Sequence, residues 1–352
     1  IIVLAIAVLP RLRIGGRQLF ASEAPGHEFQ TLSSSIRETA RRLWLVYVGL
    51  TALEVLVLAV IGWTGADREM NLFEAVAHAF TTMPTGGFST RARSLEEFAP
   101  ATQWAVTVFM VLAGTNFALM YAALRRRANP ARDDEFRLYA LLLFAATGLL
   151  FAELAARGIS EGEGAVRSAA FQAASVMTTT GYASTDFSGW PPFAALLLLV
   201  LMFVGGSALS TAGSLKVVRH LIVGKVTRRE LDQVVHPEFV APIRFNRRVV
   251  DERVIRGVGF FVLLYVGLFA LGTVLLAVES ARAGLEITPF EAASAAASTI
   301  GNVGPGFGFL GPMGSYQPFT DLSKAILIVL MWLGRLELVP VLVLFTRGYW
   351  RR

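Results

Sequence analysis

The chain has 352 residues, of which 54% are hydrophobic and 16% are charged, and its mean hydropathy of +0.56 excludes an ordinary soluble globular domain. It contains no cysteine, which excludes disulfide scaffolds, thiolate metal sites, iron–sulfur clusters and cysteine nucleophiles. The four histidines are scattered, without the i, i+4 pair of a zinc protease, so we expect a polytopic membrane protein without metal or redox chemistry.

The first element is an apolar run over residues 1–9, which is too short to cross a bilayer as a helix. We interpret it as the tail of a span whose start is missing. Long apolar runs bounded by charged residues then predict membrane spans. These runs cover residues 43–63, 104–124, 138–154, 193–204 with a continuation to 223 beyond a Gly/Ser break, 254–278 and 325–345.

Shorter apolar stretches lie between alternate spans, at residues 71–82, 166–179 and 288–299. Each has about 12 to 14 residues and is roughly 18 to 21 Å long as a helix, which is enough for only part of the membrane. Thr288 and Glu291 form a capping-box pattern, and Asn71 and Glu74 repeat the cap-plus-Glu pair. We therefore predict that these stretches are half-membrane helices.

Internal repetition is the strongest signal in the chain. FEAVAHAFTT from Phe73 and FEAASAAAST from Phe290 agree at five of ten positions, and each is followed by a Gly-rich segment and a long span. The repeated unit is a span, a half-helix, a Gly-rich turn and a second span. It occurs three times, at residues 43–124, 138–223 and 254–345.

The half-helices are followed by Gly-rich turns that read PTGGF from Pro84, TTGYA from Thr179 and NVGPG from Asn302. Non-helical backbone at membrane depth is tolerated only where it is buried or lines a watery cavity, and its free carbonyls can then coordinate an ion. The C-terminal end of a half-helix adds partial negative charge, which favours a cation. One such turn would fit an ordinary hairpin, but three copies in register favour a cation site.

The distribution of positive charge predicts the topology. Residues 10–42, 125–137, 216–256 and the tail after residue 345 hold 24 of the 32 Lys and Arg residues. By the positive-inside rule these segments are cytoplasmic, and the Gly-rich turns open to the other face. The net charge of +6 therefore reflects topology and lipid contact and gives no support for nucleic-acid binding, although the loop at 216–256 is long enough to dock a partner.

Two features inside predicted spans need an explanation. Residues 205–214, called here the Gly/Ser loop, are too rich in Gly and Ser for an uninterrupted helix, so they form either a close helix contact or a loop. Lys216 follows it and either faces a pore or reaches the cytoplasm. Arg335 lies in the middle of the last span, where it needs a cavity or a carboxylate, and Glu337 points to a different face. The sequence does not assign partners to the intramembrane acids Glu54 and Glu153.

Two other classes of protein are weaker candidates. Asp133, Asp134 and Glu135 could suggest a metal–diphosphate site, but no second acidic motif or nucleophile elbow accompanies them, so an enzyme is not expected. A secondary transporter with broken helices usually has two inverted halves, whereas these three units run in the same direction. Parallel half-helix units therefore favour a channel-like pore.

The segments PTGGF, TTGYAS and NVGPG resemble, in this order, the second, third and fourth filter segments of the Trk/Ktr/HKT superfamily of potassium transporters. The resemblance extends over nearly the whole chain. It includes LPRLRIGGRQLFASEAPG from Leu9, GGSALSTAGSLKVVR from Gly205 and GRLEL from Gly334, while RETARRLW from Arg37 resembles the Trk branch. The family has four such units, so the first pore unit is missing here apart from the end of its second span. We interpret the chain as an amino-terminally truncated fragment, with a natural three-unit protein as the alternative.

The resemblance implies roles for individual residues. The selectivity filter, with K⁺ bound mostly by main-chain oxygens, consists of Thr85, Gly86, Gly87, Thr179, Thr180, Gly181, Tyr182, Asn302, Val303 and Gly304. The gate consists of Gly205, Gly206, Ser207, Ser210, Thr211, Gly213, Lys216 and Arg335, with the arginine as an electrostatic barrier unless it forms a salt bridge between helices. In this superfamily a Gly→Ser exchange in the filter relaxes selectivity toward sodium. Gly86, Gly181 and Gly304 are intact here, but the usual place of that exchange, the first filter segment, is missing.

The predicted fold is an all-α polytopic membrane protein with repeated units around a central pore. Its parts are a first-unit span end and cytoplasmic loop (1–42), a second pore unit (43–124), a third pore unit with a broken second span (125–223), a cytoplasmic loop (224–253) and a fourth pore unit with a basic tail (254–352). The resemblance implies K⁺ uptake without a cofactor, a homodimer in the inner (plasma) membrane, and a cytosolic nucleotide-binding RCK-type regulatory subunit. Sodium-permeable or mixed Na⁺/K⁺ transport is the alternative.

Overall fold

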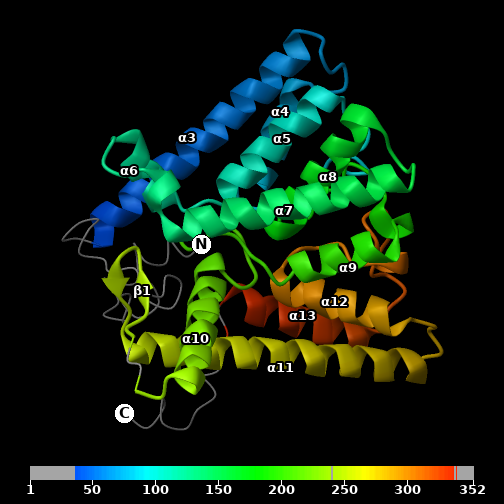
Figure 1. Ribbon diagram of the computed structural model, residues 1–352. Helices are drawn as coiled ribbons and strands as arrows, with labels where there is room; N and C mark the ends of the chain where they lie inside the picture. The colour runs from blue at the N-terminus through cyan, green and yellow to red at the C-terminus, as the bar shows by residue number, and fades with distance from the viewer. Residues whose placement is uncertain (1–35, 239–240, 337, 339–352) are drawn as a thin grey trace.

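The computed structural model describes residues 36–238, 241–336 and 338, and helices dominate it (Figure 1). The predicted all-α membrane fold is confirmed, with one small addition. A two-stranded antiparallel hairpin, β1 (Arg244–Phe245) and β2 (Arg248–Val249), lies within the predicted cytoplasmic loop. The apolar run at residues 1–9 and the segment 1–35 as a whole lie outside the described residues.

The outer helices of the three predicted units are α3 (Ile36–Trp63), α7 (Asp134–Ala156) and α11 (Glu252–Arg282), and they run in the same direction across the molecule (Figure 1). Within the described residues, these three helices are long and apolar enough to cross a membrane. Many large hydrophobic side chains on them are exposed, as lipid-facing helix surfaces require.

The three predicted half-helices are α4 (Leu72–Thr82), α8 (Gly162–Met177) and α12 (Pro289–Gly301). Thr288 and Glu291 form both hydrogen bonds of a capping box at the start of α12. At α4 only half of that motif is present: Asn71 accepts from the amide of Glu74 at 3.0 Å, while the Glu74 carboxylate pairs with Arg91. Each half-helix packs against the outer helix of its own unit.

The second span of the second unit is not the single helix predicted for residues 104–124. It consists of α5 (Pro100–Ala113) and α6 (Phe117–Leu124), which meet at 99°. The Asn116 side chain accepts hydrogen bonds from the amides of Ala118 and Leu119 and so caps a new helix. Because a Cβ on Gly114 would lie 2.6 Å from the Tyr139 hydroxyl, the break also requires a residue without a side chain.

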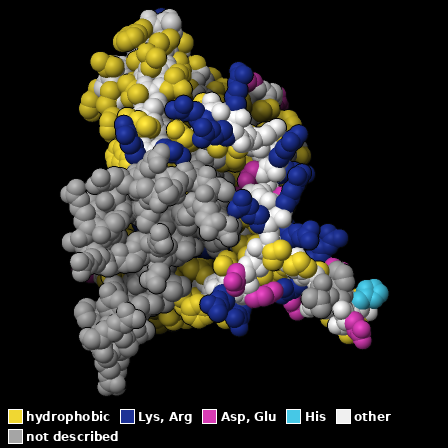
Figure 2. Space-filling model, turned by 90° about the vertical axis from the view of Figure 1, so that its left-hand side faces the viewer, with side chains coloured by type: hydrophobic (Ala, Val, Ile, Leu, Met, Phe, Trp, Pro, Cys, Tyr) yellow, Lys and Arg dark blue, Asp and Glu magenta, His cyan; other side chains and the backbone are white. Residues whose placement is uncertain are grey.

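The second span of the third unit is broken as predicted, into α9 (Pro192–Leu201) and α10 (Val217–Val235). Helix α10 continues twelve residues past the predicted unit boundary at 223, so part of the segment 224–253 is helical. Figure 2 views the side that carries α6, α10 and the hairpin, and Lys and Arg side chains gather there among the described atoms. This clustering agrees with the predicted cytoplasmic face.

The second span of the fourth unit is α13 (Asp321–Arg335). The helix predicted over residues 325–345 is interrupted in its described part, because α13 ends at Arg335 and Leu336 forms a bend, whereas Leu338 is helical again. Most of the predicted continuation, including Glu337, lies outside the described residues. The remaining elements are short 3₁₀ turns, η3 (Pro130–Arg132), η4 (Phe187–Gly189) and η5 (Gly308–Leu310).

Candidate functional site

The three Gly-rich turns share one backbone conformation. In each of them a left-handed residue and a glycine with positive φ are separated by one residue. The left-handed residues, with their φ values, are Thr85 (54°), Thr179 (57°) and Asn302 (56°), and the glycines are Gly87 (65°), Gly181 (84°) and Gly304 (117°). Left-handed backbone is costly for residues other than glycine, so its recurrence at three equivalent positions indicates a common function.

The hydrogen bonds of the turns follow the same register. The residue between the two positive-φ positions donates its amide to the carbonyl of the hydroxyl residue five positions earlier. The three pairs are Gly86 to Thr81 (2.8 Å), Thr180 to Ser175 (2.9 Å) and Val303 to Ser298 (2.8 Å). This register aligns Gly87, and not Gly86, with Gly181 and Gly304, which corrects the grouping made from the sequence.

Consecutive turns pack directly on one another at these glycines. A Cβ added to Gly87 would lie 1.9 Å from the carbonyl oxygen of Thr180, and one on Gly181 would lie 1.9 Å from that of Val303. Among the described residues, no atom lies within 4 Å of a Cβ on Gly304. The second turn therefore abuts the third and the third abuts the fourth, while no described residue abuts the corresponding side of the fourth turn.

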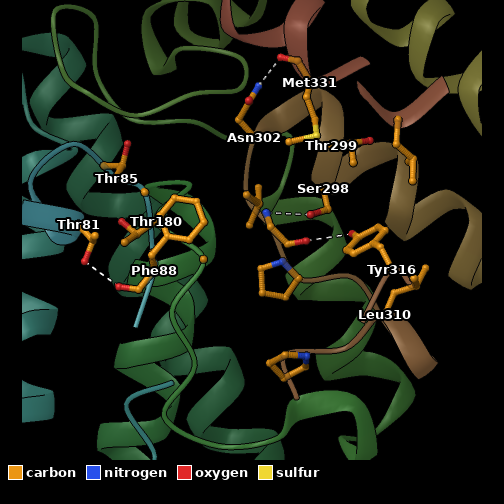
Figure 3. A pocket seen from close by; sticks show the side chains of 18 of the residues that line it. Thr81, Thr85, Phe88, Thr180, Ser298, Thr299, Asn302, Leu310, Tyr316 and Met331 are labelled. Carbon is orange, nitrogen blue, oxygen red and sulfur yellow. Dashed lines mark hydrogen bonds between the residues drawn. The ribbon is translucent and has the colours of Figure 1, made fainter. Parts of the chain in front are cut away.

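This side of the fourth turn faces a cavity of about 940 Å³ that separates the second and fourth units (Figure 3). Phe80 and Phe88 line it from the second unit, and Leu327 and Met331 of α13 line it from the fourth. Thr180 and Gly181 contribute its third-unit wall. The cavity thus has the Gly-rich turns along one wall and apolar side chains of the second and fourth units around it.

Hydroxyl groups hold the backbone of each turn. Thr81 donates to the carbonyl of Phe88 at 2.8 Å, and Ser175 donates to that of Tyr182 at 2.6 Å. In the fourth unit the Tyr316 hydroxyl instead donates to the carbonyl oxygen of Gly304 at 2.9 Å (Figure 3). These bonds use part of the hydrogen-bonding capacity of the turns and fix the orientation of their carbonyl groups.

The Gly/Ser loop closes on itself at its base. The Gly205 amide donates to the carbonyl of Leu215 at 2.8 Å, and the Val217 amide donates to that of Gly206 at 3.1 Å. A Cβ on Gly205 would lie 2.3 Å from the carbonyl oxygen of Gly213, so the two limbs approach too closely for a side chain there. The reading of this segment as a loop, and not as a close helix contact, is therefore correct.

The tip of the Gly/Ser loop contacts all three turns. The Thr85 hydroxyl lies 2.9 Å from the carbonyl oxygen of Thr211, and the amide of Gly213 donates to the Thr179 hydroxyl at 2.6 Å. A Cβ on Gly213 would lie 2.5 Å from the carbonyl oxygen of Gly301, directly before the fourth turn. The loop therefore lies against the ends of the half-helices.

The bend between α5 and α6 also binds the Gly/Ser loop through two backbone hydrogen bonds. The carbonyl groups of Ala113 and Gly114, which the broken helix leaves free, accept from the amides of Thr211 (3.3 Å) and Ser207 (2.8 Å). This contact could not be predicted from the sequence. Its local signal is Gly114 two residues before the Asn116 cap, and the partner residues lie about ninety positions away in the chain.

Two buried ionisable side chains form hydrogen bonds with the backbone of the Gly/Ser loop. Glu135 at the start of α7 is 1% exposed, and its carboxylate accepts from the amide of Ala208 at 2.6 Å. Lys216 is also buried and donates to the carbonyl of Ala212. Lys216 therefore bonds back to the loop, whereas the sequence left open whether it faces a pore or the cytoplasm. The sequence shows Glu135 only as part of an acidic motif and does not predict this bond.

Arg335 lines the cavity at the end of α13, and its side chain is exposed. Its position follows from Gly334, where a Cβ would lie 1.9 Å from the carbonyl oxygen of Ile300. This close approach places the arginine beside the base of the fourth turn. A guanidinium is also favoured at a helix C-terminus, because it complements the partial negative charge of the terminal carbonyls.

In the described part of the chain no three His, Asp or Glu side chains come together as metal ligands. The oxygen atoms of the turns belong to main-chain carbonyls and hydroxyls, which suit a hard cation. Such a site can bind an ion reversibly through exchange of its hydration shell.

The comparisons with known proteins agree with this geometry. A family model described as TrkH, cation transport protein, matches residues 1–350. The Trk system potassium uptake protein TrkH of Escherichia coli K12 is 35% identical, over the whole of this chain and 71% of its own length. The Trk system potassium uptake protein TrkH of Vibrio parahaemolyticus is 37% identical, over the whole of this chain and 71% of its own length. A crystal structure of the potassium transporter TrkH from Vibrio parahaemolyticus superimposes with a TM-score of 0.82 at 32% identity, covering 100% of this chain and 70% of that one.

Proposed function

Because the chain belongs to the TrkH family of cation transport proteins, we propose that it takes up potassium through a channel-like pore as a membrane subunit of a Trk system. Family membership makes it a membrane transporter and not an enzyme. The observation that carries the proposal is the stacking of the three Gly-rich turns, in which Gly87 abuts Thr180 and Gly181 abuts Val303. In this proposal the stacked turns supply carbonyl groups to a shared ion path.

In this proposal the carbonyl groups of the Gly-rich turns replace the hydration shell of K⁺. The half-helices end at the turns, and their terminal carbonyls add partial negative charge. Thr85, Thr179 and Asn302 contribute mainly through their backbone, since their side chains bond to the Gly/Ser loop or to α13. A fourth turn in the 940 Å³ cavity, beside Gly304, would complete the ring.

The Gly/Ser loop is the gate of the pore in this proposal. It lies against the inner ends of the turns, where it obstructs the path toward the basic face of the molecule. Its glycines allow backbone rotation, and its hydroxyls replace the hydrogen bonds that a continuous helix would have made. Arg335 adds a positive charge beside the same path and raises the electrostatic barrier to a cation.

We further propose that the protein is a homodimer in the inner (plasma) membrane, regulated by a cytosolic nucleotide-binding subunit with RCK-type domains. Support comes from the relatives, which are named as proteins of a Trk system. The basic surface around α10 and the hairpin lies on the predicted cytoplasmic side, where the proposed regulatory subunit would bind (Figure 2). The division into a second, a third and a fourth pore unit follows the repeated hydrogen-bond register of the turns.

Growth of a potassium-uptake-deficient bacterium on low-potassium medium tests the proposed function. The chain is expressed in its 352-residue form and, separately, with any sequence that precedes it in its gene. Rescue by at least one form, with protein in the membrane, is the expected result. If neither form restores growth although both reach the membrane, potassium uptake by this protein alone is contradicted. Sodium accumulation in those cells would then favour the sodium-permeable alternative.

A further inference from the structure

The segment that leaves the second Gly-rich turn has no role in the mechanism described so far. Residues 88–99, called here the turn-exit loop, connect this turn to α5. The loop is held against its own half-helix α4. His78 Nε2 lies 3.0 Å from the Ser89 hydroxyl, and the Arg91 guanidinium lies 3.3 Å from the Glu74 carboxylate. The start of the loop is therefore fixed to the second unit.

The turn-exit loop also bonds to the chain that leaves the third turn. The amide of Leu95 donates to the carbonyl of Ala183 at 2.9 Å, and the amide of Ala183 donates to the Ser94 hydroxyl oxygen at 3.1 Å. Because Ala183 is 1% exposed, loss of either partner would leave a buried main-chain group unpaired. The loop thus binds both main-chain polar groups of one residue of the third unit.

Ser94 connects equivalent positions of the two turns. Ser89 and Ala183 each lie two residues after the aligned glycines, Gly87 and Gly181. The Ser89 hydroxyl donates to the carbonyl of Ser94 at 3.2 Å, while the Ser94 hydroxyl accepts from Ala183. One residue therefore holds the exits of the second and third turns together.

The same position in the fourth unit is bonded differently. Gly306, two residues after Gly304, donates its amide to the carbonyl of Leu310 in its own unit at 2.7 Å. The exit of the fourth turn is thus held within one unit, whereas Ser94 bridges two.

Ser94 also has an unfavourable backbone conformation. Its φ of 56° is left-handed, which is costly for a residue other than glycine. A glycine would adopt this conformation without strain but could not accept the amide of Ala183. The strained serine therefore indicates that the hydroxyl is needed at this position.

We propose that Ser94 is a positioning residue for ion selectivity, which sets the spacing of the second and third Gly-rich turns through Ser89 and Ala183. Ser94 does not line the cavity, so it acts through the turns and not on the ion. If the bridge is broken, the carbonyl groups of the two turns can move relative to one another and adapt to the smaller Na⁺. The inference rests on the proposed function and deepens it, because selectivity requires that the turns carry the ion.

Two substitutions separate the hydroxyl from the backbone. Ser94→Gly removes the hydroxyl and relieves the left-handed backbone, whereas Ser94→Ala removes the hydroxyl and keeps that cost. Ser94→Ala should therefore melt at a lower temperature than Ser94→Gly, while both lose the bridge to Ala183. Ser315→Ala is the matched control, since that exposed hydroxyl accepts the amide of Gln317 within its own loop of the fourth unit.

The test measures initial rates of K⁺ and Na⁺ uptake in cells that express wild type or one of these variants at matched membrane levels, and the melting temperature of each purified protein. We expect Ser94→Gly and Ser94→Ala to lower the K⁺/Na⁺ ratio by the same factor, about fivefold to tenfold, because a buried amide loses its acceptor. Ser315→Ala should stay within about twofold of wild type. A common ratio at different melting temperatures identifies positioning, because a merely structural role would make the ratio follow stability.

An unchanged ratio in Ser94→Gly would overturn the inference, and so would a loss confined to Ser94→Ala. If neither variant reaches the membrane, Ser89→Ala tests the bridge from the second turn, because it removes the hydroxyl that donates to Ser94. Ser89→Ala should also lower the ratio, and a wild-type ratio in this variant would contradict the bridge. Failure of the proposed function is recognised separately, because wild type itself would then show no K⁺ uptake.

Discussion

The hydroxyl oxygen of Thr85 lies 2.9 Å from the carbonyl oxygen of Thr211, which joins the second Gly-rich turn to the loop beneath it. The Thr211 hydroxyl in turn donates to the carbonyl of Met83 at 2.8 Å. The turn and the loop therefore hold each other through hydrogen bonds in both directions. Any outward movement of the loop must break these bonds, so the proposed gate is coupled to the proposed filter.

Thr211→Val removes the hydroxyl that bonds to Met83 and Ala113 while it preserves the volume of the side chain. Because the net contribution of such bonds is modest, we expect the loop to open more often and K⁺ influx to rise about threefold to tenfold. The K⁺/Na⁺ ratio should stay unchanged. Ser210→Ala is the control, since that hydroxyl bonds only within the loop, to Ser207. Equal or lower influx in Thr211→Val would argue against the coupling.

Gly86→Ala and Gly87→Ala should differ sharply although the residues are adjacent. A Cβ on Gly87 would collide with the carbonyl of Thr180 and would occupy a left-handed backbone, so K⁺ uptake should be lost. The nearest atom to a Cβ on Gly86 is the Phe88 ring at 3.4 Å, so most uptake should remain. Rubidium uptake by both variants measures this. The opposite order of severity would contradict the corrected register of the second turn.

Glu135→Ala leaves the buried amide of Ala208 without its acceptor. We expect a loss of about 1–3 kcal/mol in the free energy of unfolding, measured by thermal melting of the purified protein in detergent. Glu153→Ala removes only a half-exposed pair with Arg157 and should cost less than about 1 kcal/mol. Equal melting temperatures for Glu135→Ala and wild type would show that this carboxylate does not anchor the loop.

Arg335→Ala removes a positive charge that lines the cavity beside the fourth turn. If the guanidinium is an electrostatic barrier, K⁺ influx should rise, and Arg335→Lys should restore the barrier at least in part. The measurement is influx at several membrane potentials, because a charge on the ion path also changes the voltage dependence. Loss of the protein from the membrane would instead identify Arg335 as a structural ion-pair residue.

Features that depend on local sequence could be predicted well. The half-helices follow from short apolar runs with caps at Asn71 and Thr288, and both caps are present. The break at the Gly/Ser loop follows from its composition, since Gly205 and Gly206 have no room for a side chain. Repetition of the turns was visible because each copy follows a half-helix.

Features that depend on packing between distant segments could not be predicted. The α5–α6 bend lies in a continuous apolar run, and the partners that compensate its free carbonyls, Ser207 and Thr211, come from another unit. The equivalence of Gly87 with Gly181 is equally hidden, because PTGGF offers two adjacent glycines and only the hydrogen bonds select one. The role of Glu135 is not visible in the sequence because only the fold brings Ala208 to it.

The most direct test of the proposed filter is the initial rate of K⁺ uptake into potassium-depleted cells of an uptake-deficient strain. Wild type, Gly181→Val and Gly148→Ala are compared at equal amounts in the membrane. A Cβ on Gly148 would meet no atom of the described residues within 4 Å, whereas a side chain on Gly181 would collide with the carbonyl of Val303. We predict uptake by wild type and Gly148→Ala and none by Gly181→Val. Normal uptake by well-expressed Gly181→Val would contradict the assignment of the Gly-rich turns as the potassium filter.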